Sequence, residues 1–137
     1  MIVLDCSVAV AWCFADEATP ELDALLDQVH AEGAVVPPIW TLEVTNVLIQ
    51  AARRGRLAQG AVQTRLDLLD MLPITQDDAG TGRVWRANLL ALARIEGLTT
   101  YDATYLELAI RRGLSLATSD KALRAAASGR GVTILPA

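Results

Sequence analysis

The segment from Thr99 to Asp120 constrains the fold most, because a helix signal runs directly into a strand signal. Thr99 is followed three residues later by Asp102, which is the spacing of a helix capping box, and the helical pattern ends at Gly113. Residues 114–118 then form a short apolar run that leads to Asp120. A helix that precedes a parallel strand runs antiparallel to it, so its start lies over the carboxyl end of that strand. The pattern therefore predicts that Asp102 and Asp120 meet.

The same alternation of short apolar runs and helical periodicity extends along the whole chain. Short continuous apolar runs are typical of parallel strands that are buried on both faces. We therefore expect an α/β fold, with one domain over residues 1–137 and a central, mostly parallel sheet of four to five strands between helices on both faces. The expected strands are 2–4, 34–36, 72–75 (at an edge), 114–118 and 132–135, and the expected helices are 8–14, 20–32, 39–54, 58–71, 79–95, 99–112 and 121–128.

Composition narrows the class of protein. An apolar fraction of 53% excludes a disordered chain, and the longest apolar run is shorter than the roughly 18 residues that a membrane span needs. The N-terminus has no basic start, so we expect no secretory signal and a cytoplasmic protein. Cys6 and Cys13 would lie about 10 Å apart along a helix, too far for a disulfide. A net charge of -4 argues against a protein that simply coats nucleic acid.

Four acids are expected at one edge of the sheet. Asp5 follows the first strand, Asp120 follows the fourth, Glu43 lies early in the helix that leaves the second strand, and Asp102 begins a helix that arrives there. Parallel sheets bind ligands at the carboxyl ends of their strands. Gathered carboxylates repel one another unless a cation joins them, and oxygen ligands without His or Cys favour Mg²⁺ or Mn²⁺. Such an ion can activate water for the cleavage of a phosphodiester.

Each acid also has a purely structural interpretation. Asp5 would end a strand, Asp102 would complete the capping box, and Asp120 or Ser119 would cap the last helix. Ser7 is likewise expected to cap the first helix. Glu43 is the hardest to explain in this way, since an acid on a partly apolar helix face needs a partner.

At these residues the chain resembles the PIN-domain family, and specifically the VapC toxins of bacterial toxin-antitoxin pairs. The resemblance implies a Mg²⁺- or Mn²⁺-dependent endoribonuclease with Asp5, Glu43, Asp102 and Asp120 as catalytic metal ligands. It also implies a homodimer, a cognate antitoxin that covers the site, and transfer or ribosomal RNA as the target. Positions that support the ligands in this family correspond to Ser7, Asn46 and Thr118. The matching segments are 2–7, 43–48, 100–109 and 116–123.

Other assignments stay open at this stage. Lys121 and Arg124 follow Asp120 and are candidates for RNA phosphate contacts, whereas Arg53, Arg54 and Arg56 fit either RNA binding or a helix C-terminus. One alternative function is a non-catalytic binding module with the same fold. Another is a Mg²⁺-dependent phosphatase that forms an aspartyl-phosphate, which would need a second acid two residues after the first, where this chain has serine.

Overall fold

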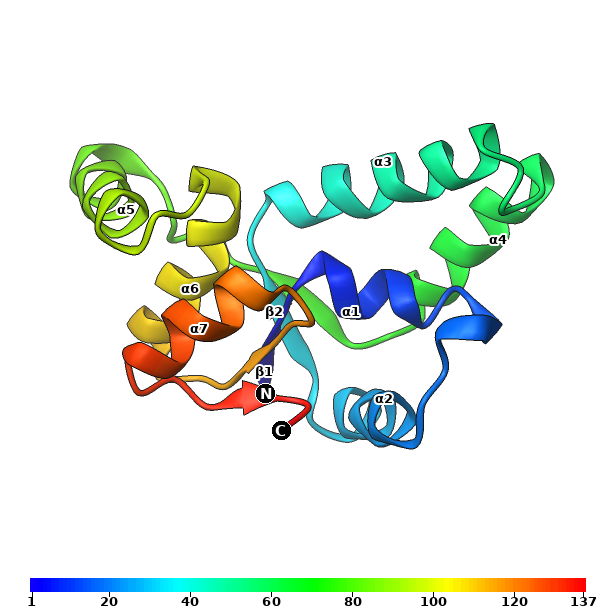
Figure 1. Ribbon diagram of the computed structural model, residues 1–137, viewed down its shortest axis with the longest axis horizontal. Coiled ribbons are helices and arrows are strands. Elements are labelled where there is room, and N and C mark those ends of the chain that lie inside the picture. The colour runs from blue at the N-terminus through cyan, green and yellow to red at the C-terminus, as the bar shows by residue number, and fades with distance from the viewer.

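The computed structural model describes residues 1–137 and is built on a five-stranded parallel sheet in the order β3-β2-β1-β4-β5 (Figure 1). Every pair of neighbouring strands is parallel. The expected α/β class and parallel sheet are therefore confirmed. The strands are β1 Ile2–Leu4, β2 Ala34–Val36, β3 Ile74–Gln76, β4 Leu116–Ala117 and β5 Ile134–Leu135.

The helices cover both faces of this sheet. The chain moves outward from β1 to β3 and then returns to β4 and β5 on the other side of β1. Because crossovers between parallel strands are right-handed, this reversal places the helices of the two halves on opposite faces, as Figure 1 shows. The helices are α1 Cys6–Ala11, α2 Pro20–Glu32, α3 Ile39–Arg53, α4 Gln59–Asp70, α5 Gly82–Glu96, α6 Thr100–Arg112 and α7 Lys121–Gly129, with a short 3-10 turn at Ala15–Glu17.

The predicted N-terminal caps are confirmed for α2, α6 and α7 and wrong for the first helix. The Thr19 hydroxyl accepts from the backbone of α2, and the Thr99 hydroxyl accepts from the Asp102 N–H at 3.1 Å. Helix α1, however, begins at Cys6, with Asp5 in the N-cap position, so Ser7 lies inside the helix and does not cap it. The serine hydroxyl instead donates to the Asp5 carboxylate and accepts from the backbone N–H of Ser119.

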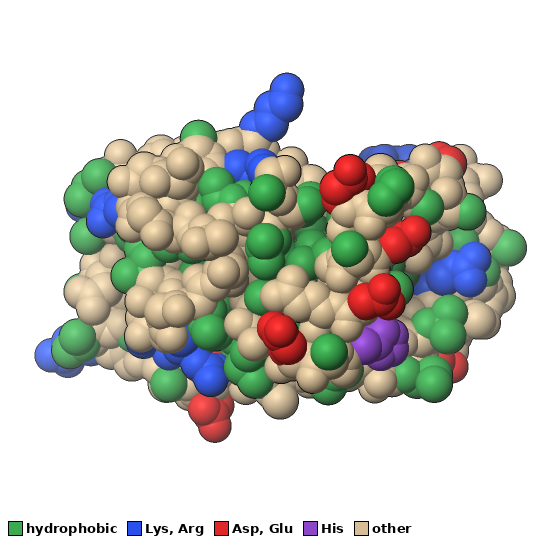
Figure 2. All heavy atoms as spheres, turned by 90° about the horizontal axis from the view of Figure 1, so that it is seen from below, with side chains coloured by type: hydrophobic (Ala, Val, Ile, Leu, Met, Phe, Trp, Pro, Cys, Tyr) green, Lys and Arg blue, Asp and Glu red, His purple; other side chains and the backbone are tan.

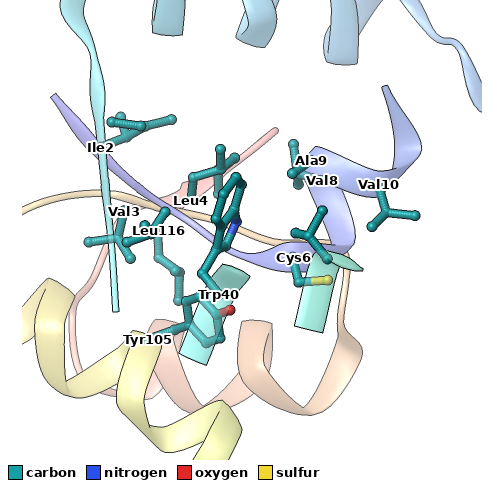
Figure 3. Packing of buried hydrophobic residues seen from close by; sticks show 14 of the residues in the cluster. Ile2, Val3, Leu4, Cys6, Val8, Ala9, Val10, Trp40, Tyr105 and Leu116 are labelled. Carbon is teal, nitrogen blue, oxygen red and sulfur yellow. The ribbon is translucent and has the colours of Figure 1, made fainter. Parts of the chain in front are cut away.

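The core lies on the two central strands and the helices against them. Every residue of β1 and β2 is buried, as continuous apolar strands of a covered parallel sheet require. The edge strand β3, which begins after Pro73, is only partly buried, as expected from a proline next to it. Both cysteines are free, as expected. Figure 3 shows the β1 side chains among those of α1, β4 and α6, with Ile2, Val3, Leu4, Val8, Leu116 and Tyr105 labelled.

The molecular surface, unlike the apolar core, carries exposed charged side chains. No helix of the structure has both the length and the apolar character needed to cross a bilayer. Figure 2 shows the face seen from below, where several Asp and Glu side chains lie near the single histidine, His30 of α2. The acids of α2 are exposed to solvent, where a carboxylate needs no partner. Asp5, at the carboxyl end of β1, is in contrast buried.

Candidate active site

The candidate site lies where the strand order reverses, between β1 and β4. Connections leave such a switch point in opposite directions and open a crevice at the carboxyl ends of the strands. Leu4 of β1 pairs with Ala117 of β4, and the Asp5 N–H donates to the Ala117 carbonyl at 2.9 Å. The residues that follow the two strands, Asp5 and Thr118, are thereby placed next to each other.

Asp5 is a buried carboxylate with one oxygen engaged and one free. Its side chain is only 5% exposed. Oδ2 accepts from the Ser7 hydroxyl and from the Thr118 hydroxyl, both at 2.7 Å, whereas Oδ1 accepts from no group of the chain. No Lys or Arg forms a salt bridge with Asp5, although a buried charge ordinarily requires such a partner.

The two hydroxyl groups also hold the loop that carries Asp120. The Asp120 N–H donates to the Thr118 hydroxyl at 3.1 Å, and the Ser119 N–H donates to the Ser7 hydroxyl at 3.0 Å. Asp120 itself caps α7, since its Oδ1 accepts from the Leu123 N–H at 2.8 Å. The structural interpretation of Asp120 is therefore correct, but the cap uses one oxygen and leaves Oδ2 without a protein donor.

Glu43 reaches the site from α3, the helix that leaves β2. The Tyr105 hydroxyl of α6 donates to Glu43 Oε1, while Oε2 has no protein donor. Burial raises the pKa of Glu43 above its ordinary value, and the charges of Asp5 and Asp102 raise it further against the lowering effect of the tyrosine. Burial is also the main reason that the Tyr105 pKa is raised, so its hydroxyl stays protonated and donates.

Asp102 lies in the first turn of α6. The capping box is only half formed, because Thr99 accepts from the Asp102 N–H but does not donate its own N–H to the Asp102 carboxylate. Burial raises the pKa of Asp102, and the charges of Asp120 and Asp5 raise it further. The charges of Asp5 and Asp102 also raise the pKa of Glu43, so the four acids lie close enough to influence one another electrostatically.

A second buried carboxylate shows how this chain treats an acid outside the site. Asp77, just beyond β3, is 6% exposed, close to the burial of Asp5. Arg111 donates to both of its oxygens, at 3.2 and 2.7 Å, and also pairs with Glu107. Hydrogen bonding to this guanidinium lowers the pKa of Asp77 below its ordinary value. The chain therefore supplies a cation to Asp77 and none to Asp5.

The donor set fits a hard divalent cation. All four acids offer oxygen, and Asp5, Glu43 and Asp120 each keep an oxygen that accepts from no protein group. Mg²⁺ and Mn²⁺ prefer such ligands. No group of three or more His, Cys, Asp or Glu side chains is gathered closely enough to hold a metal ion as it stands. An ion bound by these acids would therefore require their side chains to move closer together.

The remaining candidate residues differ in their surroundings. Asn46 is exposed on α3 and makes no side-chain hydrogen bond, and Lys121 is exposed without an ion pair. Arg124 donates to the carbonyls of Thr118 and Pro136 at 2.8 and 2.9 Å, so it ties the loop after β4 to the C-terminal segment. Any phosphate contact by Arg124 would add to that structural role.

No prediction from the sequence covers two features, Tyr105 at the site and an ion pair outside it. Tyr105 lies three residues after Asp102, so helical spacing places both residues on neighbouring parts of one helix face. This spacing could have identified Tyr105 from the sequence. The pair of Asp77 and Arg111 gave no such signal, because the two residues come from separate elements and match no motif.

Together these observations define a doubly wound α/β domain with a group of acids near its switch point. The chain belongs to the PIN-domain family, because the family model described as "PIN domain" matches residues 2–129. The resemblance seen in the sequence is thereby confirmed. PIN domains are generally nucleases, which places the chain in a class of phosphodiester hydrolases.

Solved structures support the same fold. The crystal structure of PAE2754 from Pyrobaculum aerophilum is similar with a TM-score of 0.70 and 26% identity, over 97% of this chain and 81% of that one. The crystal structure of FitAcB from Neisseria gonorrhoeae is similar with a TM-score of 0.65 and 20% identity, over 98% of this chain and 96% of that one. A comparison with the curated proteins found no match.

Proposed function

We propose that this protein is a metal-dependent endoribonuclease of the toxin-antitoxin type, in which Asp5, Glu43, Asp102 and Asp120 hold Mg²⁺ or Mn²⁺. The observation that carries the proposal is the buried Asp5 carboxylate, which has a free oxygen and no cation from the chain, while the equally buried Asp77 has one. Family membership supports the nuclease class, and the resemblance to VapC toxins supports RNA as the substrate.

Each of these side chains has a separate role in the proposed site. The hydroxyls of Ser7 and Thr118 fix Asp5 through Oδ2 and leave Oδ1 for the ligand, and Tyr105 does the same for Glu43 through Oε1. Asp102 and Asp120 complete the ring of carboxylates from the starts of α6 and α7. A bound dication would supply water activation and stabilisation of the charge that develops on the scissile phosphate. Asn46 is proposed to support the ligands from α3, and Lys121 and Arg124 to contact RNA phosphates.

The same resemblance supports a biological setting. We propose a cytoplasmic homodimer that acts on transfer or ribosomal RNA and is inhibited by a cognate antitoxin. The acidic composition, with a pI near 4.9, fits a pair in which the antitoxin supplies the basic, DNA-binding half.

The test is cleavage of total RNA with Mg²⁺ or Mn²⁺, with EDTA as the reversal. Asp5→Asn and Asp102→Asn keep side-chain shape but remove charge, and each is expected to abolish cleavage and the rise in melting temperature that Mn²⁺ produces in the wild type. Asp27→Asn, the same change at an exposed position of α2, is the matched control and should behave like the wild type. Full cleavage by a folded Asp5→Asn/Asp102→Asn double variant refutes the assignment.

One observation favours the second candidate, a non-catalytic module with this fold. The acids are not gathered closely enough to form a finished metal site. Under that alternative, Mn²⁺ leaves the melting temperature unchanged and the wild type leaves RNA intact. Stabilisation by Mn²⁺ that depends on Asp5 excludes the module.

A further inference from the structure

Tyr101 stands out among the aromatic residues of this chain. The sequence contains three Trp, two Tyr and one Phe, and of these only Tyr101 is largely exposed, with 60% of its surface accessible. Its hydroxyl makes no hydrogen bond within the chain. An exposed tyrosine ring offers a flat apolar face together with a polar hydroxyl group, which is a combination that suits contact with a ligand.

The position of Tyr101 relates it to the acidic site. It directly precedes Asp102 in the first turn of α6 and lies four residues before Tyr105. Residues four apart lie above one another on a helix face, and Tyr105 defines that face as the one directed toward Glu43. Tyr105 is fully buried and Tyr101 is exposed, so Tyr101 lies one turn nearer the start of α6, open to solvent and next to Asp102.

The backbone beneath the ring is held firmly. The Thr104 hydroxyl donates to the Tyr101 carbonyl at 2.6 Å, and the preceding turn is fixed by the Thr99 cap. Tyrosine has only two side-chain torsions, so ordering its ring costs little conformational entropy. These features suit a rigid, flat contact surface.

From this arrangement we infer that Tyr101 is a substrate-binding residue whose ring stacks on an unpaired nucleobase of the RNA. The inference rests on the proposed ribonuclease function. In a nucleotide the base is one ribose away from its phosphate, so a phosphate at the carboxylates leaves its base within reach of the neighbouring residue. Aromatic stacking is how proteins hold splayed bases, whereas a base inside a duplex offers no free face.

The experiment compares binding of two short single strands, oligoadenylate and an abasic ribose-phosphate oligomer of equal length and charge. Ca²⁺ replaces Mg²⁺, and a gel verifies that the strands stay intact. Tyr101→Ala and Tyr101→Leu are expected to weaken oligoadenylate binding roughly 5-fold to 100-fold, while Tyr101→Phe and Tyr101→Trp stay within about 3-fold of the wild type. All variants should bind the abasic strand equally. Ile110→Ala, at an exposed apolar residue near the other end of α6, is the matched control and should change nothing.

Kinetics supply a second readout. Tyr101→Ala should raise KM for single-stranded RNA with kcat nearly unchanged, because stacking on a flanking base stabilises the bound substrate and the transition state alike. Equal affinity of Tyr101→Ala and Tyr101→Phe for oligoadenylate overturns stacking while leaving the nuclease proposal intact. Equal weakening on the abasic strand also overturns it, since the contact would then be to the backbone. A wild type that neither binds nor cleaves RNA refutes both proposals.

Discussion

Replacement of Thr118 by valine tests how the site holds its buried acid. Thr118 is fully buried, and its hydroxyl both donates to Asp5 Oδ2 at 2.7 Å and accepts from the Asp120 N–H at 3.1 Å. Valine has nearly the same shape but loses both hydrogen bonds. A hydrogen bond to a charged acceptor contributes about 1.5–3 kcal/mol, and an orphaned backbone donor costs about 1 kcal/mol or more.

The expected loss in the free energy of unfolding is therefore about 2.5–4 kcal/mol. For a chain of this length, that corresponds to a fall of roughly 8–20 °C in melting temperature. Urea denaturation of the metal-free protein measures the loss directly. Ser7→Ala, which removes the other hydroxyl from the same carboxylate oxygen, should cost about 1–2 kcal/mol because Ser7 is less buried.

A double-mutant cycle isolates the charge. In an Asp5→Asn background the Thr118 hydroxyl still meets an oxygen, but a neutral one, so Thr118→Val should there cost only about 1–2 kcal/mol. The difference between the two backgrounds is the energy with which the hydroxyl stabilises the Asp5 charge. An identical loss in both backgrounds, or a Thr118→Val variant within about 0.5 kcal/mol of the wild type, refutes the reasoning.

Three further predictions concern the wider structure. Because the pKa of Asp102 is raised, the folded protein binds the proton of this carboxyl group more tightly than the unfolded chain does. The free energy of unfolding, measured without metal, should therefore fall as the pH rises above the ordinary Asp pKa of 3.8. Asp102→Asn should flatten this slope in urea titrations at several pH values. Arg111→Met leaves Asp77 buried without its cation and should cost about 2–4 kcal/mol in urea denaturation, much of which Asp77→Asn in the same chain recovers. Gly80→Ala puts a methyl group 3.0 Å from Asp77 Oδ2 and should destabilise by about 1–3 kcal/mol in thermal melts, whereas Gly60→Ala in α4 meets nothing within 4 Å and should stabilise by about 0.5–1 kcal/mol.

The fold could be predicted because local and long-range signals agree. Short apolar runs, a threonine cap before Pro20, and Gly113 at the end of α6 each limit the choices for one element. The first helix was the exception. A Ser-to-backbone cap was expected there, but Asp5 takes the N-cap position and draws the Ser7 hydroxyl to its own carboxylate. Local propensity cannot anticipate such a contact, because it depends on how deeply Asp5 is buried.

The candidate site was predictable in its positions and less so in its contacts. Strand ends and helix starts place Asp5, Asp102 and Asp120 at one edge of a parallel sheet without any knowledge of side-chain packing. The hydrogen bond from Tyr105 to Glu43 needs the actual distance between α3 and α6, which depends on side-chain volumes along both helices. The exposure of a ring is likewise a property of the packed structure.

The two buried carboxylates show how a stable domain can keep a group of acids at one edge of its sheet. If an arginine paired with Asp5 as Arg111 pairs with Asp77, the free oxygen would be occupied and the repulsion among the acids would fall, but the position proposed for a metal ion would be lost. The chain instead stabilises Asp5 with neutral hydroxyl groups, which lower the energy of the carboxylate without supplying a positive charge. Neutral donors therefore keep the negative potential that the proposed dication needs, and the burial of β1 helps to offset the repulsion among the acids.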